Sequence, residues 1–229
     1  MPNWCSTALA FYVRTEDKEG LEQLKTLQNA LKTRLNAPDP EPLESGNWIG
    51  RLLMEHGGVK QEELPSSRGF LSFVAETLEA NGDLTFLRAD SEDAWSPKIK
   101  LWEALLKLDQ FNRIGLMIIA EESGMCLYVT TDADGRFFPE KFKLDYWLKD
   151  KSTGEMKGDI EYFDSEASFL NAAEELLEIQ ADSVEDLEKK LREIDLDTDE
   201  GECFAAFAFS VYEPIRPAIE STIQEETAQ

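Results

Sequence analysis

The chain is poor in the side chains that most often hold metals or take part in nucleophilic catalysis. It contains one histidine, His56, and three cysteines, Cys5, Cys126 and Cys203, among 229 residues. The cysteines are far apart in the sequence, so no pair has the short spacing of a structural zinc site or of a dense disulfide framework. We therefore expect buried free thiols, no metal ion and no cofactor.

Two further kinds of segment are missing. No glycine pattern of the Walker A or dinucleotide-binding type occurs, so the usual backbone cradle for phosphate groups is not predicted. The opening MPNWCSTALAFYV has no basic stretch, and its apolar run is too short for a signal peptide or a membrane span. These absences predict an intracellular, cytoplasmic protein that does not associate with a membrane.

Basic side chains are also scarce. Lys and Arg number 23 against 47 Asp and Glu, which gives a formal net charge of −24. A field this negative repels nucleic-acid phosphates and anionic lipid, and it favours basic protein partners. The 42% hydrophobic content, with 13 Phe and 5 Trp, still predicts a folded core.

The first half of the chain alternates between strand and helix patterns. Residues 6–13 are apolar on both faces, as in a strand buried on both sides, and leucines recur at helical spacing over 21–35. Residues 114–120 and 125–131 predict a hairpin around Glu-Glu-Ser-Gly. Between these elements we expect short helices at 48–53 and 70–78, a short strand at 84–87, and a helix after Ser96-Pro97, with Ser as the cap and Pro in the first helical position.

The second half predicts another hairpin and a helix pair. The strands are expected at 143–149 and 157–163, the helices at 165–179 and 183–194, with Ser183 capping the second helix. Residues 204–212 are apolar on both faces, which predicts an interior strand. The polar segment that follows is expected to be a flexible tail.

Three motifs resemble a known family. Met1-Pro2-Asn3-Trp4-Cys5 leads into a strand, Asp93-Ala94-Trp95-Ser96-Pro97 precedes an apolar helix, and the strand at 114–122 is followed by Gly124. Together, over about residues 1–135, they resemble the YubB-type family of phage and plasmid proteins. The resemblance implies a ferredoxin-like domain without an iron–sulfur cluster, carriage on mobile genetic elements, and no established biochemical activity.

The predicted fold class is α+β. We expect a ferredoxin-like sandwich over 1–135, an antiparallel sheet with helices on one face, interrupted by a helical insertion at about 37–82. Residues 136–212 are expected to form an acidic α+β extension of the same sheet, and 213–229 a flexible tail. The sequence leaves the oligomeric state open.

The acidic extension is the strongest functional signal. Residues 155–204 hold 18 acidic and 4 basic side chains. One interpretation is a docking surface for a basic protein, another is a decoy that imitates nucleic-acid phosphates and inhibits a DNA-binding host protein, and a third is a pair of solvated amphipathic helices. The candidate interaction surface consists of Glu174, Glu175, Glu178, Asp182, Glu185, Asp186 and Glu188.

Enzymatic hypotheses rest on fewer residues. After removal of Met1, the secondary amine of Pro2 could act as a general base, as in tautomerases, whereas the simpler interpretation is that Pro2, Trp4 and Cys5 anchor the first strand by burial. A dyad of Cys5 with His56 requires the fold to bring them together, against a buried thiol and a loop-exposed imidazole. Asp195 to Asp199 begin like a calcium loop, but the sixth and twelfth positions of that loop do not fit.

The sequence as a whole favours a non-enzymatic accessory or protein-interaction protein of a phage or other mobile element. The nucleic-acid mimic and the Pro2 enzyme remain as alternatives. Carboxylates at phosphate-like spacing would distinguish the first, and an accessible N-terminal amine beside positive charge the second.

Overall fold

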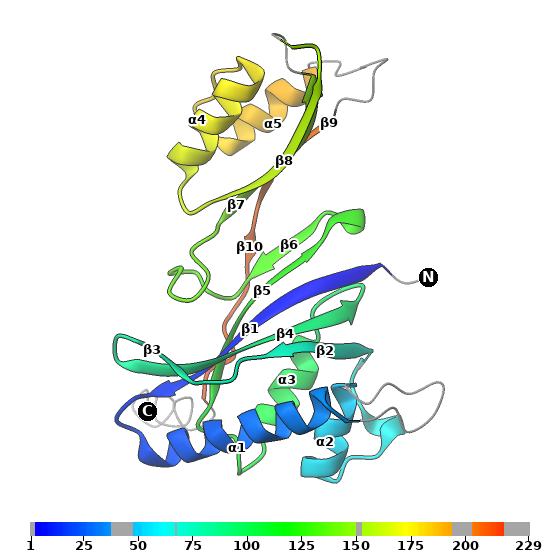
Figure 1. The fold of residues 1–229 in the computed structure, drawn as a ribbon, viewed down its shortest axis with the longest axis vertical. Helices are drawn as coiled ribbons and strands as arrows, with labels where there is room; N and C mark the ends of the chain where they lie inside the picture. The colour runs from blue at the N-terminus through cyan, green and yellow to red at the C-terminus, as the bar shows by residue number, and fades with distance from the viewer. Residues whose placement is uncertain (1–2, 38–47, 67, 150–152, 194–202, 218–229) are drawn as a thin grey trace, which may run out of the picture. The chain divides into compact units, whose positions relative to one another are not determined.

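The computed structural model describes residues 3–37, 48–66, 68–149, 153–193 and 203–217, and the fold is mixed α/β (Figure 1). Contacts between residues divide the chain into two compact units. Unit 1 comprises Met1–Ala133 with Val211–Gln229, and unit 2 comprises Asp134–Ser210. Each unit has its own sheet and its own apolar core, so each is described by itself.

The sheet of unit 1 has the strand order β10-β6-β5-β1-β4-β2, and β3 pairs with β4. The central strands β1, β4 and β5 pair antiparallel, with β1 between the other two. The strands are β1 (Trp4–Arg14), β2 (Gly69–Val74), β3 (Glu79–Asn81), β4 (Leu84–Ala94), β5 (Gly115–Glu122), β6 (Leu127–Thr130) and β10 (Ser210–Val211).

Helices α1 (Lys18–Leu35), α2 (Gly50–Gly57) and α3 (Ile99–Leu106) lie on one side of this sheet (Figure 1). Two short 3-10 turns, η1 (Gln61–Glu63) and η2 (Ser123–Met125), complete the unit. The apolar core between helices and sheet includes Phe11 of β1 and Trp102 of α3, whose ring centroids are 5.3 Å apart. The strand at 6–13, the helix at 21–35 and the hairpin predicted from the sequence are confirmed by β1, α1 and β5–β6.

The region between α1 and β4 differs from the sequence prediction. Residues 70–78 were expected to be helical, but β2 occupies Gly69–Val74 and pairs with β4, with a shift of register between Leu71 and Phe73. The spacing of Phe70, Phe73 and Val74 resembles one face of a helix, but in the sheet Phe73 is exposed and Val74 is buried, so these side chains belong to opposite faces. Within the described residues of the insertion, helical structure is confined to α2 and η1.

The start of α3 also differs. Ser96 was expected to cap the helix and Pro97 to begin it, but the helix begins at Ile99 and Lys98 is its N-cap residue. The backbone N–H of Lys98 donates to the Asp93 carboxylate at 3.3 Å, so an acidic side chain from the preceding strand takes the bond instead of Ser96.

Unit 2 has a three-stranded antiparallel sheet of order β8-β7-β9, formed by β7 (Phe142–Lys149), β8 (Met156–Phe163) and β9 (Cys203–Ala208). Helices α4 (Glu166–Leu177) and α5 (Val184–Glu193) complete it. Phe169 and Ala173 of α4 and Leu187 of α5 pack with Leu144 and Tyr146 of β7. The second hairpin, the helix pair and the Ser183 cap, which accepts the N–H of Asp186 at 3.2 Å, agree with the prediction.

The second half forms a sheet of its own where the sequence led us to expect one continuous sheet. Only β10 joins the sheet of unit 1. β9, expected to be interior, is an edge strand that pairs with β7 alone, and its small side chains Ala205, Ala206 and Ala208 explain why an edge position resembled a buried pattern.

Two smaller expectations also change. Cys5 is buried as expected, but Cys126 is exposed in a left-handed turn conformation, and the Cys203 side chain lies outside the described part. The start of the expected flexible tail is anchored, because Ile215 is 9% exposed and pairs with Leu116 of β5. Among the described residues, no helix is both long enough and apolar enough to cross a membrane.

Candidate functional site

The acidic residues predicted from the sequence gather at the C-terminal end of α4 and on α5. Glu174, Glu175 and Glu178 line a surface hollow of about 790 Å³, together with Asn171 and Gln180. None of the described residues that line this hollow is basic. The structure therefore brings three of the seven predicted residues into one local surface.

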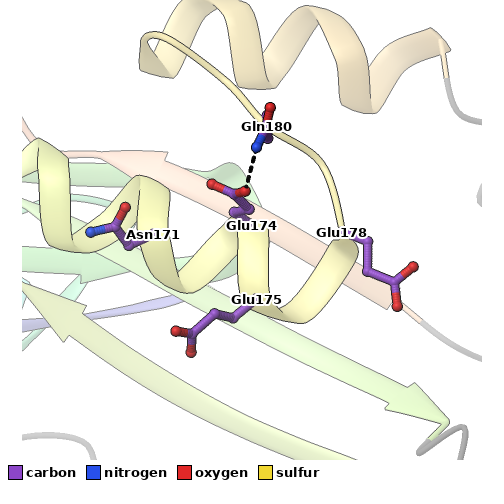
Figure 2. Close-up of a pocket in the computed structure, with 5 residues that line it drawn as sticks. All are labelled: Asn171, Glu174, Glu175, Glu178 and Gln180. Atoms are coloured by element: carbon purple, nitrogen blue, oxygen red, sulfur yellow. Dashed lines mark hydrogen bonds between the residues drawn. The ribbon is translucent and has the colours of Figure 1, made fainter.

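The hollow is formed by the last turns of α4 and the connection to α5. In Figure 2, Glu175 and Glu178 point in different directions, and Glu174 turns toward Gln180. The Gln180 amide donates to Glu174 Oε1 at 2.9 Å, so the described polar partner of this carboxylate is neutral. The three carboxylates thus form a negatively charged surface and do not point toward one common centre.

Glu178 ends α4 in an unusual backbone conformation. Its φ of 59° lies in the left-handed region, and its N–H donates to the Glu174 carbonyl at 2.7 Å. Helices commonly end with a residue in this conformation, but the residue is usually glycine because it has no Cβ. The chain therefore has a charged, exposed side chain where glycine would be less strained.

The four remaining predicted residues follow the hollow in the chain. Asp182 and Glu185 are exposed and Glu188 is half-buried on α5 or just before it. Asp186 has a structural role, because its carboxylate accepts from Lys190 at 2.7 Å and from the Asp182 N–H at 3.2 Å. These bonds, the one from Lys190 above all, hold the pKa of Asp186 below its usual range.

This arrangement favours ionic contacts with cationic groups. Within the described ranges, no group of three or more His, Cys, Asp or Glu side chains is arranged to hold a metal ion. Exposed carboxylates around an open hollow attract lysine and arginine side chains of a partner, and the attraction is screened by salt.

A second polar cluster, which the sequence analysis missed, lies at the end of the unit 1 sheet near Cys5. Asp93 Oδ2 accepts from Thr7 Oγ1 at 2.9 Å and from Ser91 Oγ at 3.2 Å, in addition to the Lys98 N–H. Lys98 Nζ donates to the Ala94 carbonyl at 2.6 Å. Thr7, Ser91 and Asp93 are all 0% exposed, so this polar cluster is closed to solvent.

Burial dominates the electrostatics of this cluster. It raises the pKa of Asp93 to about 6 although Thr7, Lys98 and Ser91 favour the charged form, and it raises the pKa of the Cys5 thiol to about 12. Burial likewise lowers the pKa of Lys98. Asp93 Oδ1 is buried without a hydrogen-bond partner and lies against Gly69. The cluster holds the end of β4 to β1 and to the start of α3.

A sequence signal for this cluster did exist. Ser91 and Asp93 continue the alternation of Leu87 and Ala89 along β4, so they share the face that is buried. An acidic residue in phase with buried apolar residues indicates a buried carboxylate that needs donors. The unexpected length of β4 hid this, because the predicted strand ended at residue 87.

The enzymatic hypotheses gain no geometric support. Pro2 and Asp195 to Asp199 lie outside the described residues. The Cys5 thiol has Thr7 as its side-chain neighbour, whereas His56 is on the last turn of α2 with its ring against Phe111 at 5.5 Å. His56 is half-buried and helical where a loop-exposed ring was expected.

Trp4 was expected to be buried but is 43% exposed. Arg68, which the sequence analysis did not single out, lies with Cζ 5.7 Å from the centroid of the Trp4 ring. Arg14, the nearest basic residue in the sequence, is at the opposite end of β1, about 33 Å away at the usual rise of a strand.

Comparisons of the chain with models of protein families, with curated proteins and with solved structures find no match.

Proposed function

We propose that the chain is a non-enzymatic protein-interaction protein whose unit 2 binds a basic partner at the end of α4. The observation that carries the proposal is the hollow lined by Glu174, Glu175 and Glu178, where the other described lining residues, Asn171 and Gln180, are neutral. Residues 134–210 hold 22 acidic and 9 basic side chains, so the surrounding field has the same sign. A lysine-rich surface or segment is the complementary partner.

The fold type of unit 1 and the role on a mobile genetic element are proposed from the sequence resemblance. We propose that unit 1 is of ferredoxin-like type, which is supported by the succession β1, α1, β2, β4, α3, β5 with α2 and β3 as additions. The YubB-type resemblance of the motifs around Trp4 and Trp95 supports a role on a mobile genetic element.

The test is a binding titration with a defined basic probe. A fluorescein-labelled deca-lysine peptide is titrated with the full chain, and fluorescence anisotropy gives the Kd. The variant Glu174→Gln, Glu175→Gln, Glu178→Gln removes three negative charges from the hollow. We expect about tenfold weaker binding, at a few tenths to one kcal/mol for each exposed ionic contact.

The matched control removes three exposed charges from unit 1: Glu16→Gln, Glu62→Gln, Asp109→Asn. Equal losses in both triple variants would mean that net charge alone attracts the peptide, and the proposed site would be wrong. Competition by duplex DNA for a DNA-binding partner, once one is found, would move the assignment to the nucleic-acid mimic.

A further inference from the structure

The face of the unit 1 sheet opposite α1, α2 and α3 carries acidic and aromatic side chains. Trp4, Ser6 and Ala8 of β1 alternate with the buried Cys5 and Thr7, so they point to this second face, which we call the open face. It is defined by Trp4, Ser6, Ala8, Phe70, Phe73, Asp90, Glu92, Ile119 and Glu121, as the strand registers place them.

The registers place carboxylates on both sides of a small side chain. Ser6 pairs with Glu92 of β4 on one side and with Glu121 of β5 on the other. Ala8, the next residue of β1 on this face, pairs with Asp90. Neighbouring strands are about 4.8 Å apart, so the backbones of Glu92 and Glu121 are about 10 Å from each other. The small side chains of β1 lie between them.

These carboxylates are partly withdrawn from water. Burial raises the pKa of both Asp90 and Glu92, and the Ser6 hydroxyl donates to Glu92. An incoming cation at such a position gains more than it would at a fully solvated carboxylate, because the local dielectric is lower.

Aromatic side chains adjoin the carboxylates at the N-terminal end of β1. Trp4 is 43% exposed and packs edge-on against Phe70, with ring centroids 5.8 Å apart, and Arg68 already lies over the Trp4 ring. Trp95 follows the strand partner of Trp4, donates its N–H to the Asn3 carbonyl at 2.9 Å, and is 49% exposed.

Trp95 has a strained backbone. Its φ of 71° is in the left-handed region, where a bulky residue is rarely found. Such strain is concentrated at binding sites and active sites. Trp95 directly follows Ala94, the strand partner of Trp4, so the strained residue marks the same end of the sheet as the Trp4 and Phe70 rings.

We propose that the open face of unit 1 is a second binding surface, which takes an arginine-bearing segment of a partner protein. Guanidinium groups stack on aromatic rings and pair with carboxylates through two parallel hydrogen bonds, and the face offers both within one or two residue spacings. The chain's own arginines already show both kinds of contact: Arg88 is 3.7 Å from Glu79 and lies over the Phe86 ring, and Arg68 lies over the Trp4 ring. This goes beyond the function proposed for unit 2 and does not depend on it.

The test isolates unit 1 within the full chain. In the Glu174→Gln, Glu175→Gln, Glu178→Gln background, three labelled decapeptides are titrated: alternating Arg-Gly, Lys-Gly and citrulline-Gly. We expect the arginine peptide to bind at least about threefold more tightly than the lysine peptide, and the uncharged citrulline peptide to bind more weakly than both.

Two sets of substitutions locate the binding. Asp90→Asn with Glu92→Gln is expected to weaken the arginine peptide about tenfold, whereas the control Glu16→Gln with Glu62→Gln weakens it less than twofold. Trp4→Leu is expected to remove the preference for arginine over lysine. Ser6→Lys places a positive charge on the open face without altering the core. It tests the same site if the Asp90→Asn, Glu92→Gln variant does not fold.

Equal binding of the arginine peptide to the Asp90/Glu92 pair variant and to the control pair would overturn the proposal, as would equal binding to Ser6→Lys and its parent. A loss of deca-lysine binding on Glu174→Gln, Glu175→Gln, Glu178→Gln bears only on the proposal for unit 2. The two proposals can therefore be contradicted independently.

Discussion

Asp93 in unit 1 and Glu175 in unit 2 are both acidic, but Asp93 is 0% exposed and accepts hydrogen bonds from Thr7, Ser91 and Lys98, whereas Glu175 is exposed at the rim of the hollow. The buried carboxylate is surrounded by donors from three segments of the chain, so it acts as a structural link. The exposed one belongs to a hollow whose described lining residues are acidic or neutral. Position relative to the core, and not residue type, separates the structural acids from those available to a partner.

The largest expected effect tests how tightly the region around Asp93 is packed. A Cβ at Gly69 would collide with Asp93 Oδ1 and lie 3.1 Å from Ile49 Cδ1, and both neighbours are fully buried. We expect Gly69→Ala to lower the free energy of unfolding of unit 1 by about 3 kcal/mol. Urea unfolding, followed through the amide signals of β1 and β4, measures it.

Gly158→Ala in unit 2 is the matched control. Its Cβ would meet the ring of Trp147, which is 48% exposed. A loss below about 1 kcal/mol is expected there, because exposed neighbours move at low cost. Similar losses at both glycines would contradict the difference in packing between the units.

The second effect is a dependence of stability on pH that belongs to Asp93. Its folded pKa of about 6 lies above the 3.8 that is usual for an aspartate, so the folded state binds the proton more tightly and unit 1 gains stability as the pH falls through 6. Between pH 7 and pH 5 this gain is about 1 kcal/mol. Asp93→Asn is expected to remove it.

The measurement compares urea unfolding of the parent chain and of Asp93→Asn at pH 7 and at pH 5. The contributions of the other carboxylates cancel in the difference between the two proteins. Glu175→Gln serves as the exposed control and should leave the pH dependence of unit 1 unchanged. A pH dependence that survives in Asp93→Asn would show that another group carries it.

The smallest effect separates stability from binding in unit 2. Glu178 has a φ of 59°, so Glu178→Gly relieves a left-handed residue and is expected to raise the stability of unit 2 by about 1 kcal/mol. The same substitution removes a charge from the hollow and should weaken the binding of deca-lysine. Amide exchange along α4 reports the first effect and anisotropy the second, and a loss of both stability and binding would contradict the assignment.

The sequence predicted local elements better than their assembly. The periodicity of Leu24, Leu27 and Leu31 defined α1 because one face of that helix is buried, and both hairpins followed from turn residues between apolar runs. The pairing of β2 with β4 and the separation into two sheets depend on contacts between distant segments, which local patterns do not encode.

The candidate site was predictable only in part. The density of acidic residues indicated the surface, and Glu174, Glu175 and Glu178 do share one hollow. Asp186 and Lys190 form an i,i+4 pair on α5, a spacing that the sequence already contains. The burial of Asp93 beside Thr7, in contrast, depends on the pairing of β4 with β1, which only the folded chain provides.

The most direct test of the central claim is to map the binding of the deca-lysine peptide residue by residue on the full chain by amide chemical shifts. The account predicts that the first signals to move, at the lowest peptide concentration, are those of residues 171–180, and that added salt reverses the change. Binding that shifts only unit 1 signals, or that shifts residues 171–180 equally at low and high salt, would contradict it.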